Sequence, residues 1–240
     1  MGYVAAEVYG HPSQSFTLLG VTGTSGKTTT TYMLEKGLTA AGCKVGLIGT
    51  TGTKIMGRDV ATELTTPEAP MLQRLFAQMR DEGVTHVVME VSSHALMLGR
   101  VTGSDFDVAA FTNLSQDHLD FHPTMEDYFQ AKALFFEPGS EMRAKRSVVC
   151  VDDEWGQRMA ELAEAPVTVA TTGDADVTAE LVRIDDQGRQ RIQLTADDTY
   201  EFTLPMPGAF NVANAALAAA IATTAGAELA PFLHLSLIHI

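Results

Sequence analysis

Cysteine is scarce in this 240-residue sequence, which contains only Cys43 and Cys150. Two cysteines so far apart exclude a small disulfide-stapled scaffold and favour buried thiols in a reducing compartment, so we expect a cytoplasmic protein. Long apolar runs are also absent, since no stretch approaches the roughly 18 residues of a membrane span. The first residues lack the basic start and apolar core of a secretory signal. We therefore expect no membrane partner.

Basic residues are few, with 16 Lys and Arg against 30 Asp and Glu, for a formal net charge of −14. This excess of negative charge argues against non-specific binding of nucleic acid or an anionic membrane surface. It does not exclude an anionic ligand in a local cationic site, because charges beyond about 8 Å are largely screened at physiological salt.

Apolar segments alternate with helix-like segments over the first two thirds of the chain, which predicts an α/β fold with a mostly parallel sheet flanked by helices. The expected strands are 15–21, 44–50, 85–91, 107–113 and 147–151, and the expected helices are 27–41, 67–82, 124–136 and one starting at residue 153. After about Pro166, segments with period-two alternation predict a small antiparallel portion. An alanine-rich helix is expected over 209–226.

The stretch GVTGTSGKTTTTYMLEKGL (20–38) joins the first expected strand to a helix. Such a junction offers unpaired N–H groups and the positive end of a helix dipole to a phosphate. Two glycines let the backbone approach closely, Lys27 can reach the β- and γ-phosphates, and the hydroxyl of Thr28 or Thr29 can join a Mg²⁺ shell. The predicted phosphate-binding residues are Gly23, Thr24, Ser25, Gly26, Lys27, Thr28 and Thr29. Val21 stands where the general pattern has glycine, and an ordinary Gly/Thr turn before a helix is the alternative interpretation.

Acidic and imidazole side chains follow two other expected strands. Glu90 ends one of them, a position that suits a Mg²⁺ ligand or, alternatively, an ion-paired glutamate. The second strand is followed by NLSQDHLDFH (113–122), whose spacing is not that of a zinc site because no thiolate takes part. The segment is typical of a loop that binds a metal other than zinc, although Asp117 and Asp120 could instead cap a helix start or a loop.

The motifs TGTSGKTTT, TTPE, MEVSSHAL, FTNLSQDHLDFH, YFQAKALFF and GAFNVANAALAAA occur in this order along the chain. In this order they resemble the Mur ligases, ATP-dependent amide-bond ligases of peptidoglycan precursor synthesis, over roughly residues 10–225. The resemblance implies ATP and Mg²⁺ as cofactors. It also implies a UDP-N-acetylmuramoyl dipeptide and a diamino acid, lysine or diaminopimelate, as substrates. In the implied reaction a substrate carboxylate attacks the γ-phosphate of ATP, which forms an acyl phosphate and releases ADP. The amine of the diamino acid then attacks the acyl phosphate, which gives the amide and releases phosphate.

The same resemblance implies roles for individual residues. His118 matches a histidine that helps to bind Mg²⁺, so Thr28, Glu90 and His118 form the expected metal set. Lys132 matches a lysine that CO₂ carbamylates, with a salt bridge as the alternative. Only a neutral amine reacts, and at a reference pKa near 10.4 about one lysine in 2,500 is neutral at pH 7. Lys27, Lys132 and His118 are the expected catalytic residues.

The substrate-binding residues implied by the family are Thr65, Thr66, Ser92 and Arg100. Helix capping is the alternative for the two threonines, and a plain surface arginine for Arg100. Leu64 and Leu98 stand where some members carry asparagine and glutamine, so those two roles do not transfer.

Asn211 is expected near the adenine, together with Asn214 one turn later. Capping of the alanine-rich helix is the alternative for both asparagines.

The resemblance also suggests boundaries. Residues 1–14 are expected to be the remnant of an N-terminal domain or linker, 15–227 the ATP-binding domain, and 228–240 a truncated or artefactual tail. We therefore expect a fragment with weak or no ligation by itself, and a monomer is the simplest oligomeric state. The alternatives are a folylpolyglutamate- or cyanophycin-type ligase and a non-catalytic nucleotide-binding remnant. A P-loop GTPase lacks support because no N-K-x-D signature is present.

Overall fold

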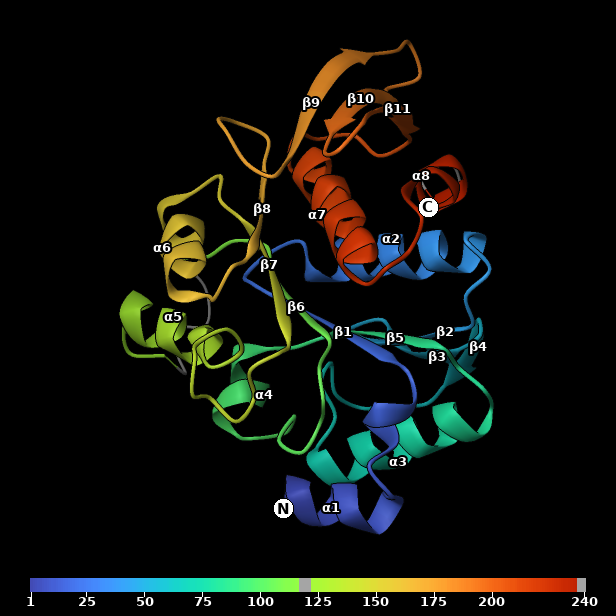
Figure 1. The fold of residues 1–240 in the computed structure, drawn as a ribbon, viewed down its shortest axis with the longest axis vertical. Helices are drawn as coiled ribbons and strands as arrows, with labels where there is room; N and C mark the ends of the chain where they lie inside the picture. The colour runs from blue at the N-terminus through green and yellow to red at the C-terminus, as the bar shows by residue number, and fades with distance from the viewer. Residues whose placement is uncertain (117–121, 237–240) are drawn as a thin grey trace.

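The computed structural model describes residues 1–116 and 122–236, with only the backbone for 234–236 (Figure 1). The described strands are β1 (Thr17–Thr22), β2 (Val45–Gly49), β3 (Gly52–Ile55), β4 (Arg58–Val60), β5 (His86–Glu90), β6 (Val108–Phe111), β7 (Arg146–Cys150), β8 (Val167–Ala170), β9 (Val177–Ile184), β10 (Gln190–Thr195) and β11 (Thr199–Leu204). The described helices are α1 (Gly2–Tyr9), the 3₁₀ turn η1 (Pro12–Ser15), α2 (Lys27–Ala40), α3 (Ala69–Asp81), α4 (Ser93–Met97), α5 (Met125–Ala133), α6 (Glu154–Leu162), α7 (Phe210–Thr224) and α8 (Leu229–Ser236).

All described strands belong to one sheet, in the order β11-β10-β9-β8-β7-β6-β1-β5-β2-β3-β4. The strands from β9 to β2 pair in parallel, whereas β3 and β4 at one end and β10 and β11 at the other pair antiparallel. The central strands are buried along nearly their whole length because helices cover both faces of the sheet, as parallel sheets require.

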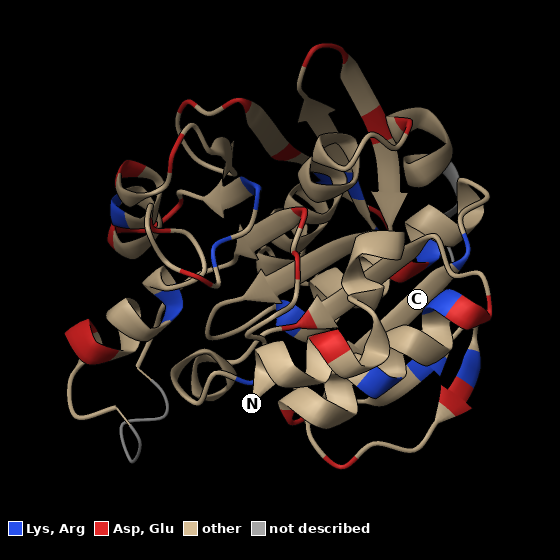
Figure 2. Ribbon diagram, turned by 60° about the horizontal axis from the view of Figure 1, so that its bottom comes forward, with Lys and Arg blue, Asp and Glu red and all other residues tan. Residues whose placement is uncertain are grey.

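Two apolar layers sandwich this sheet. On one face α2, α7 and α8 pack together, so closely that a Cβ on Gly37 of α2 would lie 2.2 Å from the ring of Phe232 in α8. On the other face the core is built from α3, α4, α5 and α6, and α1 packs on α3 (Figure 1). Figure 2 shows that many of the charged residues lie on loops and helices around the sheet. Among the described residues, none of the helices has the length and apolarity to cross a membrane.

The expected α/β architecture and its small antiparallel portion are confirmed, with element boundaries within a few residues. The clearest boundary error is the helix expected over 124–136, which ends at Ala133 and continues as turns. The sequence analysis did not predict α1, α4, α8 or the β3–β4 hairpin. It also missed β8, which lies after Pro166 but pairs in parallel with β7 and β9, so the antiparallel portion starts only at the β9–β10 pair. In that hairpin Met56 and Gly57 both adopt positive φ, which suits the tight turn of a two-residue loop. Residues 229–236, for which the sequence offered no structural account, form α8.

Candidate functional site

The predicted phosphate loop lies at the carboxyl end of β1, between β5 and β6. From β1 the chain passes through α2 to β2 on one side of β1, and after β5 it crosses to β6 on the other side. The carboxyl ends of strands at such a reversal of direction are where open α/β sheets bind ligands. The fold thus places the loop at the point in the sheet best suited to a ligand.

Two glycines shape this loop for steric reasons. Gly23 has φ 143° and Gly26 has φ 87°, conformations that side chains other than glycine rarely adopt. A Cβ on Gly23 would lie 1.8 Å from Oγ1 of Thr112, and one on Gly26 would lie 2.3 Å from Oδ1 of Asn214. Neighbouring side chains therefore press against the loop backbone and leave no room for a Cβ.

The residues directly after β6 hold the loop in place. Thr112 Oγ1 donates to the Ser25 carbonyl at 2.7 Å, and Asn113 Oδ1 accepts from the Ser25 N–H at 3.0 Å. The backbone N–H of Thr24 donates to the Asn113 carbonyl at 2.9 Å. These bonds tie two segments that are almost 90 residues apart in the chain, so they give the loop one fixed shape before any ligand arrives.

Lys27 and Thr29 lie in the first turn of α2, whose leading N–H groups have no carbonyl partner within the helix. The Nζ atom of Lys27 bends back over the loop and donates to the carbonyls of Gly23 at 2.9 Å and Thr24 at 2.8 Å. This places one cation and the positive end of a helix at the same spot. The combination suits a phosphate, whose oxygens accept hydrogen bonds and carry negative charge.

Glu90 and Thr28 meet on the α2 side of the sheet, as the predicted metal set requires. The carboxylate of Glu90 is 1% exposed; its Oε2 accepts from Thr28 Oγ1 at 3.1 Å and from Thr50 Oγ1 at 3.0 Å, and its Oε1 accepts from the Thr50 N–H at 2.9 Å. These partners are neutral, which does not match the alternative of an ion-paired glutamate. A carboxylate beside a threonine hydroxyl is a hard-oxygen pair of the kind that Mg²⁺ prefers when phosphate oxygens and water complete its shell. The residues present fit Mg²⁺, although no cluster of three or more Asp, Glu, His or Cys occurs in the described ranges.

Lys132 of α5 approaches the same loop from the opposite face of the sheet. Its side chain is 1% exposed, and its Nζ donates to the Gly23 carbonyl at 2.9 Å. The same Nζ lies 4.3 Å from the ring centroid of Tyr128, whose hydroxyl is 3.3 Å from Thr24 Oγ1. Lys27 and Lys132 therefore share a single carbonyl acceptor, although 105 residues (132 − 27) separate them.

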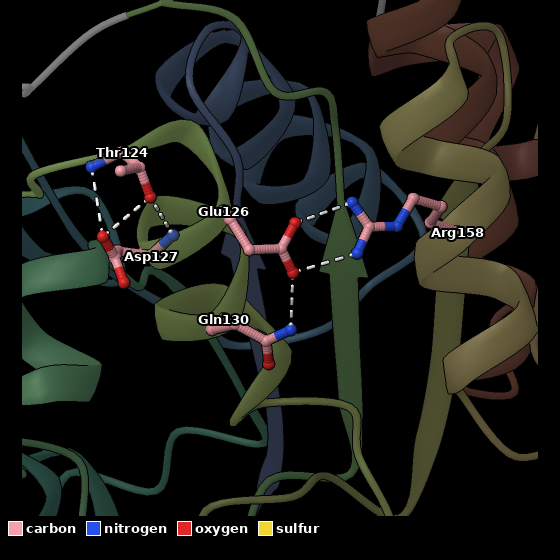
Figure 3. Close-up of polar contacts among 5 residues, drawn as sticks. All are labelled: Thr124, Glu126, Asp127, Gln130 and Arg158. Atoms are coloured by element: carbon pink, nitrogen blue, oxygen red, sulfur yellow. Dashed lines mark hydrogen bonds and ion pairs between the residues drawn. The ribbon is translucent and has the colours of Figure 1, made fainter.

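The position of α5 is fixed at its first turn and along its outer side (Figure 3). Thr124 and Asp127 form a reciprocal capping box, in which the Asp127 N–H donates to Thr124 Oγ1 at 3.1 Å and Asp127 Oδ2 accepts from the Thr124 N–H at 3.1 Å. Glu126 accepts two bonds from the Arg158 guanidinium of α6, at 2.9 and 3.0 Å. Hydrogen bonds from Arg158, and then from Gln130, lower the pKa of Glu126 to about 2. This ion pair links the outer side of α5, the helix that carries Lys132, to α6.

The four predicted substrate-binding residues gather beyond the carboxyl end of β5. Thr66 Oγ1 donates to the Glu90 carbonyl at 2.9 Å and accepts from the Ser92 N–H at 3.2 Å, so it does not cap α3. Arg100 donates from Nη1 to the Thr66 carbonyl at 3.3 Å, and its Nη2 lies 2.8 Å from Glu68 Oε1. Its side chain is only 16% exposed, unlike that of a plain surface arginine.

The other two members of this group have local partners. Ser92 Oγ caps α4 by accepting from the Ala95 N–H at 3.1 Å. Thr65 Oγ1 is 3.3 Å from the Thr50 hydroxyl, which itself contacts Glu90. The four residues thus form one polar wall next to Thr28 and Glu90.

A cavity of about 310 Å³ separates the loop from α7. Its lining comprises Ser25, Gly26, Thr112, Asn113, Cys150, Asp152, Asp153, Thr171, Ala209, Phe210, Ala213, Asn214 and Leu217. Asn211 does not line it: its Nδ2 donates to the Pro207 carbonyl at 2.7 Å, and its Oδ1 accepts from Asn214 Nδ2 at 3.3 Å. Neither asparagine caps α7. Asn211 thus orients Asn214, and Asn214 is the residue that faces the loop.

Several site residues escaped the sequence analysis. Thr50, Thr112 and Tyr128 belong to no expected ligand pattern, because each acts through a partner distant in the sequence. Asp152 could have been noticed as an acidic residue directly after a strand. Its carboxylate accepts from the N–H groups of Thr171 at 2.7 Å and Thr172 at 3.2 Å and so closes the far wall of the cavity.

The predicted ligand His118 lies outside the described residues, as do Asp117 and Asp120. Its role stays a prediction. The end of the same segment is described: His122 is buried, its Nε2 is 2.9 Å from Ser93 Oγ, and its ring stacks on that of Tyr128 at 4.8 Å.

Comparisons with known protein sequences point to one family. The model of the Mur ligase middle domain matches residues 21–222. The UDP-N-acetylmuramoyl-L-alanyl-D-glutamate–2,6-diaminopimelate ligase of Corynebacterium glutamicum is 64% identical over 231 residues, which is 95% of this chain and 45% of that protein. The ligase of the same name from Streptomyces avermitilis is 47% identical over 96% of this chain and 45% of its own length.

Solved structures give the same result. A structure of a UDP-N-acetylmuramoyl-L-alanyl-D-glutamate–2,6-diaminopimelate ligase superimposes with a TM-score of 0.85 at 29% identity, covering 97% of this chain and 49% of that one. Folylpolyglutamate synthase from Thermotoga maritima shares the fold, with a TM-score of 0.73 at 14% identity over 98% of this chain and 60% of that one. The chain spans about half the length of the curated relatives it matches. With the middle-domain model matching most of its length, the chain belongs to the Mur ligase family.

Proposed function

We propose that this chain, with 15–227 as its ATP-binding domain, supplies the catalytic centre of a cytoplasmic ligase that joins 2,6-diaminopimelate to UDP-N-acetylmuramoyl-L-alanyl-D-glutamate. The relatives at 64% identity carry that activity in their names, which favours diaminopimelate over lysine. The single observation that carries the proposal is the convergence of Lys27, Lys132 and the Thr28–Glu90 pair on the loop after β1.

The loop's task is to hold the triphosphate of ATP. Residues 23–29 would surround the β- and γ-phosphates, and Lys27 would exchange its two carbonyl acceptors for phosphate oxygens. In the first step the substrate carboxylate attacks the γ-phosphorus, which brings two anions together. At about 4 Å and an effective dielectric of 20, two unit charges repel by about 4 kcal/mol. Lys27 and the N–H groups of α2 offset this repulsion and stabilise charge on the transferring phosphoryl group.

Thr28 and Glu90 would hold Mg²⁺, together with His118. The ion supplies charge neutralisation at the phosphate oxygens. Thr50 positions the Glu90 carboxylate through two hydrogen bonds and so keeps one face of it directed at Thr28. Asn214, oriented by Asn211, would contact the nucleoside end of ATP in the cavity next to α7.

We further propose that Lys132 is the site of carbamylation. The amine is shielded from bulk water, and the modification would convert a cation beside Gly23 into an anion on the α5 side of the loop. On the substrate side, Thr65, Thr66, Ser92 and Arg100 would bind the muramoyl peptide. Arg100 would exchange Glu68 for an anionic group of the substrate, because its planar fork suits a carboxylate or phosphate.

The test combines two measurements on the 240-residue chain: binding of radiolabelled ATP in the presence of Mg²⁺, and formation of the tripeptide product from the UDP-muramoyl dipeptide and diaminopimelate. We expect ATP binding that is lost in Lys27→Ala, with weak or no ligation by this chain alone. A full-length version that binds ATP but ligates neither diaminopimelate nor lysine would refute the ligase assignment. Equal ATP binding by the parent and Lys27→Ala would refute the phosphate-loop assignment.

A further inference from the structure

Thr22, the last residue of β1, carries a buried hydroxyl without a hydrogen-bond partner among the described residues. The residue is 0% exposed, and its Oγ1 is one of the few buried side-chain oxygens among the described residues that have no hydrogen-bond partner. Burying a hydroxyl without a partner is unfavourable, so native proteins rarely do it without a functional reason. The position directly before Gly23 suggests where that reason lies.

The register of the sheet shows which way this hydroxyl points. Thr22 pairs with Phe111 of β6, and paired residues of parallel strands direct their side chains to the same face. The ring of Phe111 packs against Phe136, at a centroid distance of 6.2 Å, in the apolar layer that contains α5. Val21, one residue earlier, faces the opposite layer with α2. Thr22 therefore faces α5, away from the Thr28–Glu90 pair.

Lys132 of α5 approaches the loop from that same face. Its Nζ donates to the carbonyl of Gly23, the residue covalently joined to Thr22. In the unmodified chain this amine donates to the Gly23 carbonyl, and the Thr22 hydroxyl has no hydrogen-bond partner among the described residues. A carbamate extends beyond Nζ by one carbon and two oxygens, so it adds hydrogen-bond acceptors on the side of the sheet that the Thr22 hydroxyl faces.

We propose that Thr22 is a positioning residue for a carbamate on Lys132, with its O–H donating to a carbamate oxygen. This inference rests on the carbamylation proposed above. In that step the neutral Nζ forms a C–N bond to CO₂, a C=O π pair moves to oxygen, and the nitrogen releases one proton to solvent, giving R–NH–COO⁻ and H⁺. The hydroxyl then has the acceptor it lacks, and the anion gains a hydrogen bond that the amine state does not have.

The chain offers a matched control. Thr30 of α2 is also 0% exposed with an unpartnered Oγ1 among the described residues, but α2 covers the opposite face of the sheet. Thr22→Val and Thr30→Val each replace a hydroxyl by a methyl group of similar shape. Only the first removes a donor on the Lys132 side.

The experiment measures the carbamate directly by ¹³C NMR of the 240-residue chain in ¹³C-bicarbonate, with Mg²⁺ and a non-hydrolysable ATP analogue. Lys132→Arg identifies the signal by abolishing it. We expect Thr22→Val to lower the carbamate-to-amine ratio about tenfold, the effect of losing one hydrogen bond to a charged group. Thr22→Ser, which keeps the hydroxyl, should restore most of it, and Thr30→Val should match the parent.

Two outcomes separate this inference from the proposed function. A parent signal that persists unchanged in Thr22→Val would overturn the role of Thr22 and leave carbamylation intact. A parent without any Lys132-dependent signal would overturn both. Circular dichroism and thermal unfolding check the fold, and a Thr22→Val chain that unfolds would show a structural hydroxyl, which also contradicts the inference.

Discussion

Substitution of Gly23 by alanine tests the claim that tight packing shapes the phosphate loop. Two terms add. The first is conformational, because φ 143° lies in a region used almost only by glycine, where another residue costs about 1–3 kcal/mol. The second is steric: Thr112 Oγ1, 1.8 Å from the new Cβ, must move and give up its bond to the Ser25 carbonyl. A lost hydrogen bond of this kind costs about 0.5–1.5 kcal/mol.

The expected destabilisation is therefore about 1.5–4.5 kcal/mol, which for a chain of this size lowers Tm by about 3–18 °C. Gly139→Ala is the matched control, because Gly139 also has positive φ, 92°, but nothing lies within 4 Å of its added Cβ. It should show the conformational term alone, about 1–2 kcal/mol. Thermal unfolding followed by circular dichroism gives both values, and binding of radiolabelled ATP should weaken only in Gly23→Ala.

The steric term can be isolated by a double-mutant cycle with Thr112→Ala. Removing the Thr112 side chain opens the space that the new Cβ needs, so the double variant should be less destabilised than the sum of the two single variants. If Gly23→Ala is no more destabilising than Gly139→Ala and shows no coupling to Thr112, the loop is not packed as described and the reasoning fails.

Three further expectations concern other parts of the structure. Lys27→Ala should lose ATP binding by at least tenfold while its circular dichroism spectrum and Tm stay close to the parent's, and an unchanged affinity would contradict its placement over the loop. Glu126→Gln should be less stable than the parent at neutral pH. Because the folded pKa of Glu126 is about 2, below its ordinary 4.5, this stabilisation is complete above pH 4.5 and disappears as the pH falls toward 2. Urea unfolding of the parent and Glu126→Gln at several pH values checks this prediction. If the difference between their free energies of unfolding grew on acidification, the prediction would be wrong. Burial raises the pKa of the Cys150 thiol to about 12, so iodoacetamide at pH 8 should leave Cys150 unmodified in the folded chain and label it in urea, as mass spectrometry can show.

The sequence by itself determined the elements that depend on interactions between residues close together in the chain. Alternating apolar segments predicted the parallel strands and their covering helices, and the G-x-x-G-K-T-T stretch predicted a phosphate loop at a strand–helix junction. The helix expected to begin at Thr124 starts at Met125, with Thr124 as its N-cap. These features depend on side-chain spacing and turn chemistry within a few residues, so they can be read without knowing what packs where.

Only the tertiary structure decided which side chains meet. The contact of Lys132 with Gly23 spans 109 residues, and that of Asn113 with Ser25 spans 88. Such pairs follow from strand order and register, which set what lies at the carboxyl end of β1. The hydroxyls of Thr22 and Thr28 also face opposite sides of the sheet for this reason: the pleat directs Thr22 toward α5, and the helix start directs Thr28 toward Glu90. No local pattern encodes that choice, because it depends on which neighbours the completed sheet brings to each face.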